Sequence, residues 1–170
     1  MAAYMTGVKM RNEVISMSAD TQPRDPATKK NYTSGADSTC PAGNGTPATT
    51  LLELAKAAGK SVGAVTTTTV THATPAATYA HICNRNGENA IAAQAVPGGA
   101  GYNSALGAGL DVLLGGGTDH FLPTTAGGRR TDGRDLTAEL KAQGYTYVNS
   151  GSALMALDTA ATTRLVGLFS

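Results

Sequence analysis

The sequence predicts an α/β fold with a mostly parallel sheet flanked by helices. Short apolar and β-branched runs alternate along the chain with segments of helical periodicity, which is the order of βαβ units. Glycine closes several of the helical segments, as is common at helix ends. A polar cluster follows the first strand directly, at the edge of the sheet where α/β proteins bind ligands.

The first predicted elements lie on either side of Gly59. Residues 49–58, TTLLELAKAA, place apolar side chains at the spacing of one helical face, and Gly59 ends this helix. Residues 62–65 are predicted to form the first strand, and a β-branched polar run follows at 66–71. Thr74-Pro75 indicates an N-cap followed by proline at the first helical position, so a second helix is expected there.

The rest of the chain continues the same alternation. Further helices are predicted at 88–95, 133–143 and 152–158, and further strands at 111–114, 145–148 and 163–169. Residues 18–47 are rich in Pro, Asn, Asp, Ser, Thr and Gly and lack apolar periodicity, which indicates a long surface excursion. A length of 170 residues fits one domain, so residues 1–170 are interpreted as a single α/β unit carrying that excursion.

Composition excludes several classes of function. A net charge of +1 with 15% charged residues offers no basic face, which argues against nucleic-acid binding. There is no run of about 18 apolar residues and no charged start followed by an apolar segment, so neither a membrane span nor a signal peptide is expected. With 21 glycines, no tryptophan and 5% aromatic residues, the core should consist of small side chains and give modest stability.

The two cysteines, Cys40 and Cys83, lack the spacing of a zinc site such as C-x-x-C. A single disulfide is the preferred interpretation, and two buried free thiols are the alternative. Gly115–Gly117 lacks the G-x-G-x-x-G register, so nucleotide binding has little support.

His72, Thr74 and Arg85, which follow the first strand, are the candidates for a chemical role. Taken alone, Thr74 would be a helix cap, His72 a structural histidine and Arg85 a surface arginine. A threonine hydroxyl can also bind magnesium, and an arginine fork can pair two phosphate oxygens. If 75–84 were one straight helix, Arg85 would lie about 15 Å from Thr74 along its axis, so the helix must end early or turn back.

The segment Lys60–Arg85, KSVGAVTTTTVTHATPAATYAHICNR, resembles the alkaline phosphatase family. Family members carry [DH]-A-[TS]-P-A after a V-T-T-like strand, with an arginine shortly downstream. Further collinear matches are T-G-V-K at 6–9, LLELAKAAGKSVGAV at 51–65, and GLDVLLGGG ending at Gly117. The resemblance implies that Thr74 and His72 belong to a magnesium site and that Arg85 binds substrate. Because His72 brings no negative charge, magnesium should bind more weakly than in relatives with aspartate there.

The resemblance covers an interior part of such an enzyme, so a partial domain is expected. Family members place the nucleophile in an Asp-Ser-Ala motif that starts the helix leading into T-G-V-K, and this chain begins inside that helix. The family's zinc ligands lie beyond Ser170, so no catalytic residue is assigned here. Asp119-His120 resembles a zinc-ligand pair but follows the glycine turn and is interpreted as unrelated, while His81 is interpreted as a packed or capping histidine.

The resemblance implies a metal-dependent phosphate monoester hydrolase whose serine nucleophile and zinc ligands lie outside this chain. The implied cofactors are Mg2+ and Zn2+, and a homodimer is compatible with the family. A periplasmic or extracellular location is also implied, where a Cys40–Cys83 disulfide could persist. The missing serine motivates the alternative, a noncatalytic phosphate- or metal-binding remnant of the fold. In a third arrangement, ranked last, several chains assemble and a partner supplies the nucleophile.

Overall fold

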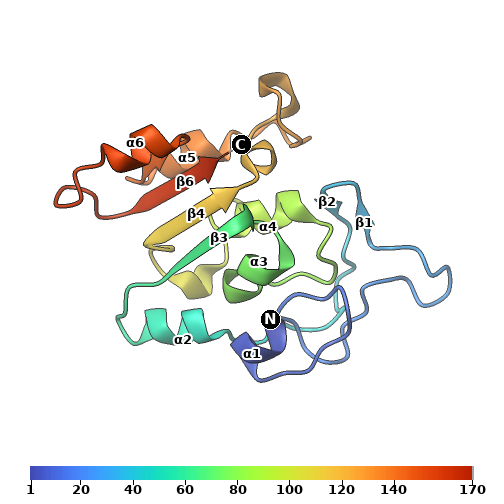
Figure 1. The fold of residues 1–170 in the computed structure, drawn as a ribbon. Helices are drawn as coiled ribbons and strands as arrows, with labels where there is room; N and C mark the ends of the chain where they lie inside the picture. Colours follow the sequence, from blue (N-terminus) through green and yellow to red (C-terminus); the bar gives the residue numbers. More distant parts are fainter. Residues whose placement is uncertain (170) are drawn as a thin grey trace.

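The computed structural model describes residues 1–169 and is built on a four-stranded sheet of order β3-β4-β6-β5 (Figure 1). All neighbouring strands in this sheet run parallel. The strands are β3 (Gly63–Thr69), β4 (Val112–Gly116), β5 (Thr146–Val148) and β6 (Leu165–Phe169). The predicted α/β class with a parallel sheet is therefore confirmed. The first strand runs to Thr69 and so is longer than the predicted 62–65, because Thr69 pairs with Gly116 of β4 after a shift in register.

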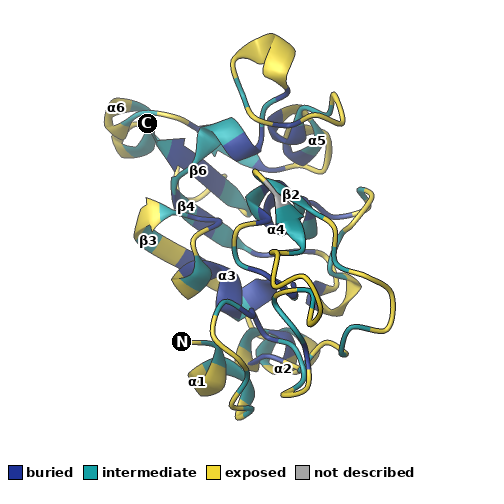
Figure 2. Cartoon of the chain, turned by 90° about the vertical axis from the view of Figure 1, so that its right-hand side faces the viewer, coloured by how far each residue is buried: buried dark blue, intermediate teal, exposed yellow. Residues whose placement is uncertain are grey.

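Six α-helices accompany the sheet in the described residues. They are α1 (Ala2–Thr6), α2 (Leu51–Ala57), α3 (Ala73–Tyr79), α4 (Glu88–Gln94), α5 (Leu136–Ala142) and α6 (Gly151–Met155). Figure 2 shows α4 and α5 on one side of the sheet and α6 on the other. The helix predicted at 133–143 begins only at Leu136, because the Asp135 side chain caps it there. No helix within residues 1–169 has the length and apolar character needed to cross a bilayer.

Small side chains dominate the core, as the composition predicts. Six alanines of α3, α4 and the segments that follow them are buried: Ala76, Ala77, Ala80, Ala92, Ala93 and Ala95. Tyr79 and Phe121 supply the few large rings that are fully buried. Glycine also permits close packing of strands, because a Cβ on Gly115 would lie 2.9 Å from the Thr68 carbonyl oxygen and 2.9 Å from Val70 Cγ1.

A buried carboxylate fixes α2 to the segment after α3. The Thr50 hydroxyl accepts from the Glu53 amide while Glu53 Oε2 accepts from the Thr50 amide at 2.7 Å, which is a capping box. Glu53 Oε1 also lies 2.6 Å from His81 Nε2 and 2.6 Å from Asn103 Nδ2. His81 Nδ1 lies 2.6 Å from the Ser16 carbonyl oxygen, so both ring nitrogens face an oxygen acceptor. The predicted packed role of His81 is confirmed.

Burial raises the pKa of the Glu53 carboxyl, but its hydrogen bonds oppose this effect. The donors are Asn103, the Thr50 amide and His81, and together they hold the pKa of Glu53 below its usual value of 4.5. The carboxylate is therefore ionised at neutral pH although its side chain is only 4% exposed.

The two ends of the excursion at 18–47 are joined to each other, and a disulfide ties the excursion to the rest of the chain. The Ser18 amide donates to the Thr46 carbonyl at 2.8 Å, which closes the loop at its base. A short hairpin, β1 (Thr33–Ser34) with β2 (Asp37–Ser38), lies within the loop. Cys40 and Cys83 form a disulfide, so the preferred interpretation is confirmed and that of two free thiols is wrong.

Reducing the Cys40–Cys83 disulfide is expected to lower the free energy of unfolding by roughly 4 kcal/mol, because the crosslink closes a long loop in the unfolded chain. The two cysteines are 43 positions apart in sequence. Urea unfolding with and without dithiothreitol measures the effect. A Cys40→Ala, Cys83→Ala double variant serves as the control, since dithiothreitol should not change its unfolding. Equal urea midpoints for the oxidised and reduced protein would contradict the expectation.

Candidate functional site

The carboxyl end of β3 leads within three residues into α3. His72 is the N-cap of α3, with extended backbone angles and no side-chain capping bond, and its carbonyl accepts from the Ala76 amide at 2.9 Å. The prediction that Thr74 caps this helix is therefore wrong. Pro75 lies at the third helical position instead of the first, where its missing N–H also has no intrahelical acceptor to lose.

Because Thr74 does not cap the helix, its hydroxyl is available to a ligand. The Thr74 side chain is exposed and makes no hydrogen bond to any residue in 1–169. It lines a cavity of about 320 Å³, and Arg85 lines the same cavity. The structure thus brings these two predicted site residues to one hollow at the carboxyl edge of the sheet.

Arg85 reaches this edge because α3 ends early and the chain returns. The helix ends at Tyr79, and the next residue, Ala80, is extended. Ile82 then pairs antiparallel with Ile15, with two backbone hydrogen bonds of 3.0 Å. The Arg85 amide donates to the Glu13 carbonyl at 2.7 Å. The early helix end that the sequence required is therefore present, and the disulfide at Cys83 holds the same returning segment.

The returning segment places the Arg85 guanidinium against the His72 ring. Arg85 Nη2 lies 2.8 Å from His72 Nε2. A guanidinium can only donate, so Nε2 of His72 is the acceptor and a neutral ring carries its proton on Nδ1. This contact uses one of the five guanidinium donors and leaves the others for a ligand.

Glu13 is the acidic residue nearest to Arg85 in this cavity wall, and Arg24 neutralises it. Arg24 donates to both Glu13 carboxylate oxygens, at 3.1 and 2.8 Å. The hydrogen bond from Arg24 is the main cause that lowers the pKa of Glu13, against a small rise from burial, and the charges of Arg24 and Arg85 lower it further. Arg85 therefore keeps its charge available to an anion.

These residues fit one side of a magnesium site. Magnesium takes oxygen ligands and keeps several waters, so the free Thr74 hydroxyl suits a direct contact. His72 suits an outer position, because Nε2 already accepts from Arg85 and Nδ1–H can donate to a metal-bound water. Within residues 1–169 no three His, Cys, Asp or Glu side chains group closely enough to hold a metal ion, so Thr74 and His72 alone do not complete a site.

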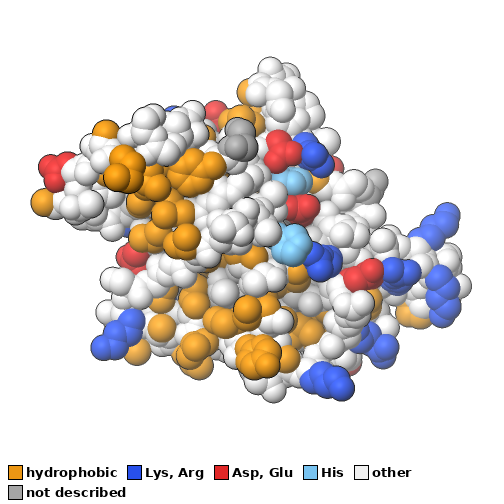
Figure 3. Space-filling view, viewed as in Figure 1, with side chains coloured by type: hydrophobic (Ala, Val, Ile, Leu, Met, Phe, Trp, Pro, Cys, Tyr) orange, Lys and Arg blue, Asp and Glu red, His pale blue; other side chains and the backbone are white. Residues whose placement is uncertain are grey.

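A second polar network lies beside this cavity and centres on Glu88, which the sequence analysis missed. Glu88 Oε2 accepts from Thr71 Oγ1 at 2.5 Å and from Thr69 Oγ1 at 3.3 Å, and lies 3.3 Å from His120 Nε2. Figure 3 shows histidine, acidic and basic side chains following one another along this edge of the molecule. Only the position of Glu88 in the first turn of a helix distinguished it in the sequence, which is a weak signal.

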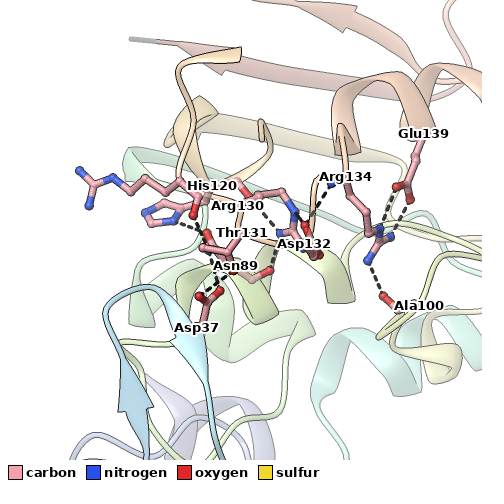
Figure 4. Close-up of polar contacts among 10 residues, drawn as sticks. Asp37, Asn89, Ala100, His120, Arg130, Thr131, Asp132, Arg134 and Glu139 are labelled. Atoms are coloured by element: carbon pink, nitrogen blue, oxygen red, sulfur yellow. Dashed lines mark hydrogen bonds and ion pairs between the residues drawn. The ribbon is translucent and has the colours of Figure 1, made fainter. Parts of the chain in front are cut away.

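Asp119-His120 belongs to this network and joins the end of β4 to α4. His120 Nδ1 lies 3.1 Å from Asn89 Oδ1, and Arg130 donates to the Asn89 and His120 carbonyl oxygens (Figure 4). Burial lowers the pKa of His120, although the nearby carboxylates of Glu88 and Asp119 oppose this shift. Through these contacts the buried His120 helps to hold the end of β4 against α4.

The fold and the cavity together define an α/β protein equipped to bind an anion such as phosphate at the carboxyl edge of its sheet. An arginine fork and a free hydroxyl line the cavity, and the imidazole of His72 contacts that arginine. The chain belongs to the alkaline phosphatase family, whose family model, Alkaline phosphatase, matches residues 1–170. The predicted family is therefore confirmed.

Two relatives illustrate how much of such a protein this chain represents. It is 34% identical over 189 aligned residues to the tissue-nonspecific isozyme of alkaline phosphatase from Rattus norvegicus, covering 98% of this chain and 33% of the relative. The crystal structure of Thermus thermophilus alkaline phosphatase superposes with a TM-score of 0.70 at 36% identity, covering 98% of this chain and 27% of that one. The chain thus spans about a third of the curated relative's length.

A third comparison concerns magnesium. It is the structure of a TAB5 alkaline phosphatase variant in which a histidine is replaced by aspartate, with magnesium bound. It matches at a TM-score of 0.66 and 24% identity, covering 98% of this chain and 36% of that one. At this identity the likeness shows the fold alone.

Proposed function

We propose that residues 1–170 are one part of a larger α/β domain and contribute the phosphate clamp and one side of the magnesium site of a phosphate monoester hydrolase. The observation that carries the proposal is that Arg85 lines one cavity with Thr74 and also contacts His72. Membership of the alkaline phosphatase family supports it. The serine nucleophile and the zinc ligands would come from outside this chain.

Each of the three side chains has a distinct part in this proposal. Arg85 would pair two oxygens of the phosphoryl group and offset the charge that develops on them. His72 would hold the guanidinium plane through its Nε2 and orient a metal-bound water through Nδ1–H. Thr74 would contribute one oxygen ligand, and the bound magnesium would supply charge stabilisation and more acidic waters.

The position of α1 supports the same assignment of the nucleophile. This helix packs against α3, and Met1 lines the cavity with Thr74 and Arg85. In the family the nucleophilic serine starts the helix that leads into T-G-V-K, which is the sequence that follows α1 here. A serine supplied just ahead of α1 would therefore be delivered toward the cavity.

We further propose a phosphate monoester as the substrate, zinc as the second metal, a homodimer as the assembly and a periplasmic or extracellular location. The Cys40–Cys83 disulfide supports the location, because such bonds persist in oxidising compartments. The alternative function is noncatalytic binding of phosphate or metal by the same three residues.

The intact mass of the native protein, measured together with hydrolysis of p-nitrophenyl phosphate, tests the proposal. A mass well above 17.1 kDa with turnover is the expected result. A mass near 17.1 kDa with phosphate binding but no turnover would establish the noncatalytic alternative. Turnover by a protein of 17.1 kDa would overturn both the proposed function and the noncatalytic alternative. It would require a nucleophile within this chain, and neither hypothesis assigns one.

His72→Asp is expected to tighten magnesium binding by about tenfold, because a carboxylate beside the Thr74 hydroxyl adds a negative charge worth roughly 1.4 kcal/mol. Titration calorimetry of the chain with magnesium chloride measures the change. His72→Asn is the matched control, since it has the shape of aspartate without the charge and should give no such gain. Equal magnesium affinities for the two variants would mean that position 72 does not face the ion.

A further inference from the structure

We infer that the candidate phosphate cavity opens into a second anion subsite formed around Arg11, so that the preferred substrate is a phosphate monoester whose leaving group carries another anionic group. This inference rests on the proposed function and names its substrate class. A carboxylate and a second phosphate are the chemistries that such a subsite would take.

Two cavities share one wall at this place. The first, of about 320 Å³, is lined by Lys9, Thr74 and Arg85 among others. The second, of about 440 Å³, is lined by Arg24 and Lys29 among others. Residues 11–13 line both cavities, so Arg11 contributes to the wall that the two cavities share. A ligand held by Arg85 would extend past Arg11 when it enters the second cavity.

The acidic groups in these walls already have donors. Arg24 pairs with both oxygens of the Glu13 carboxylate. Asp25 Oδ1 accepts from the Ala27 and Thr28 amides at 2.9 and 2.7 Å, and the Thr28 amide bond is the main cause that lowers the pKa of Asp25. The walls of the two cavities carry five cationic side chains against these two carboxylates, so an excess of positive charge remains: Lys9, Arg11, Arg24, Lys29 and Arg85.

Two cations in the walls lack such a partner. The side chains of Lys9 and Arg11 form no ion pair and no hydrogen bond with other residues in 1–169. The whole chain has a net charge of only +1, so the charge of Lys9, Arg11 and Arg85 around one cavity is a local concentration. Figure 3 shows basic side chains gathered over the N-terminal loops, beside the edge that carries the histidines.

Arg11 is the residue expected to recognise the second anion. Its planar fork can pair both oxygens of a carboxylate or two of a phosphate, whereas Lys9 offers a single charged centre. An esterified phosphate alone would occupy Arg85 and leave Arg11 without a partner. A substrate with two anionic groups satisfies both arginines, and this difference is the basis of the selectivity.

Binding of matched phosphonates to the chain, without added metal, tests the inference. The probes are methylphosphonate, which has one anionic group, and phosphonoacetate, 3-phosphonopropionate and 4-phosphonobutyrate, which add a carboxylate at increasing reach. At least one carboxylated probe is expected to bind about tenfold more tightly than methylphosphonate. This ratio of dissociation constants should fall toward one in Arg11→Gln and when salt is added.

The controls separate this inference from the proposed function. Lys30→Gln removes a cation that belongs to the excursion at 18–47 and lines neither cavity. This variant should leave the ratio of dissociation constants unchanged. Equal binding of all four probes, or an unchanged ratio in Arg11→Gln, would overturn the second subsite while the phosphate clamp stands. Failure of every probe to bind, or an Arg85→Gln variant that binds methylphosphonate as well as the parent, would overturn the clamp and with it the subsite.

Discussion

Replacing Arg85 with alanine is expected to weaken the binding of inorganic phosphate by about 10- to 100-fold. A charge-assisted pair of hydrogen bonds from a guanidinium contributes roughly 1.5–3 kcal/mol, and each 1.4 kcal/mol corresponds to a factor of ten. The guanidinium is already held in place by His72 at 2.8 Å, so little ordering of Arg85 is needed when phosphate binds. Titration calorimetry at low ionic strength measures the change in the isolated chain. In a longer polypeptide that turns over substrate, the Michaelis constant should rise and phosphate inhibition should weaken.

Two further variants identify the cause of the Arg85 effect. Arg85→Lys keeps the charge and loses the fork, so its phosphate affinity should lie between those of the parent and Arg85→Ala. Arg129→Ala removes an arginine that pairs with Asp119 outside the cavity walls and should leave phosphate affinity unchanged. If Arg85→Ala binds phosphate as well as the parent, Arg85 is not part of the site.

Replacing Glu53 with alanine is expected to lower the free energy of unfolding by about 3–5 kcal/mol, because it leaves the donors of His81 and Asn103 without their acceptor. The His81 ring lies between the Glu53 carboxylate and the Ser16 carbonyl, and the side chains of Glu53 and His81 are both more than nine-tenths buried. The change also removes the capping box of α2 and an acceptor of Asn103. Urea unfolding at neutral pH measures the loss.

Glu53→Gln separates the charge from the packing. The pKa of Glu53 is lowered in the folded state, so its contribution to stability is fully present above about pH 4.5 and is lost as the pH falls through the lower folded value. The glutamine variant should be less stable at neutral pH and should show a shallower loss of stability on acidification. Parallel loss of stability in parent and variant below pH 4.5 would mean that Glu53 is not the titrating group.

The local parts of the fold were predictable from sequence because their signals are local. The alternation of strands and helices, and the glycines that end them, lie within each segment and gave nearly all the elements. The start of α3 was misplaced by two residues, because Thr-Pro has the same sequence whether threonine caps the helix or lies inside it. The helix starts after His72, whose carbonyl accepts the first helical hydrogen bond although its side chain makes no capping bond.

The contacts that assemble the site were less predictable because they are not local. The segment that carries Arg85 is held in place by the pairing of Ile82 with Ile15, a partner far back in the chain. The sequence around either isoleucine gives no sign that the two residues pair. The resemblance to a family pointed to Arg85, His72 and Thr74. It carried no information on Glu88 or on Arg11, because both residues lie outside the motifs that carry the resemblance.

The hydrogen bond between Arg85 and His72 joins residues only 13 positions apart, with Thr74 between them. Closing a loop of this length costs little conformational entropy, and loops of about ten residues close within about 10–100 ns. The parallel sheet depends instead on pairing between strands far apart in sequence, such as β3 with β4, which slows folding. The contact between Arg85 and His72 is therefore close in sequence, whereas the cavity around it also depends on residues 9–15 and on the pairing of Ile82 with Ile15. A synthetic peptide of residues 69–88 contains the whole loop, so transient closure in that peptide would show how much of the site's geometry is encoded without the sheet.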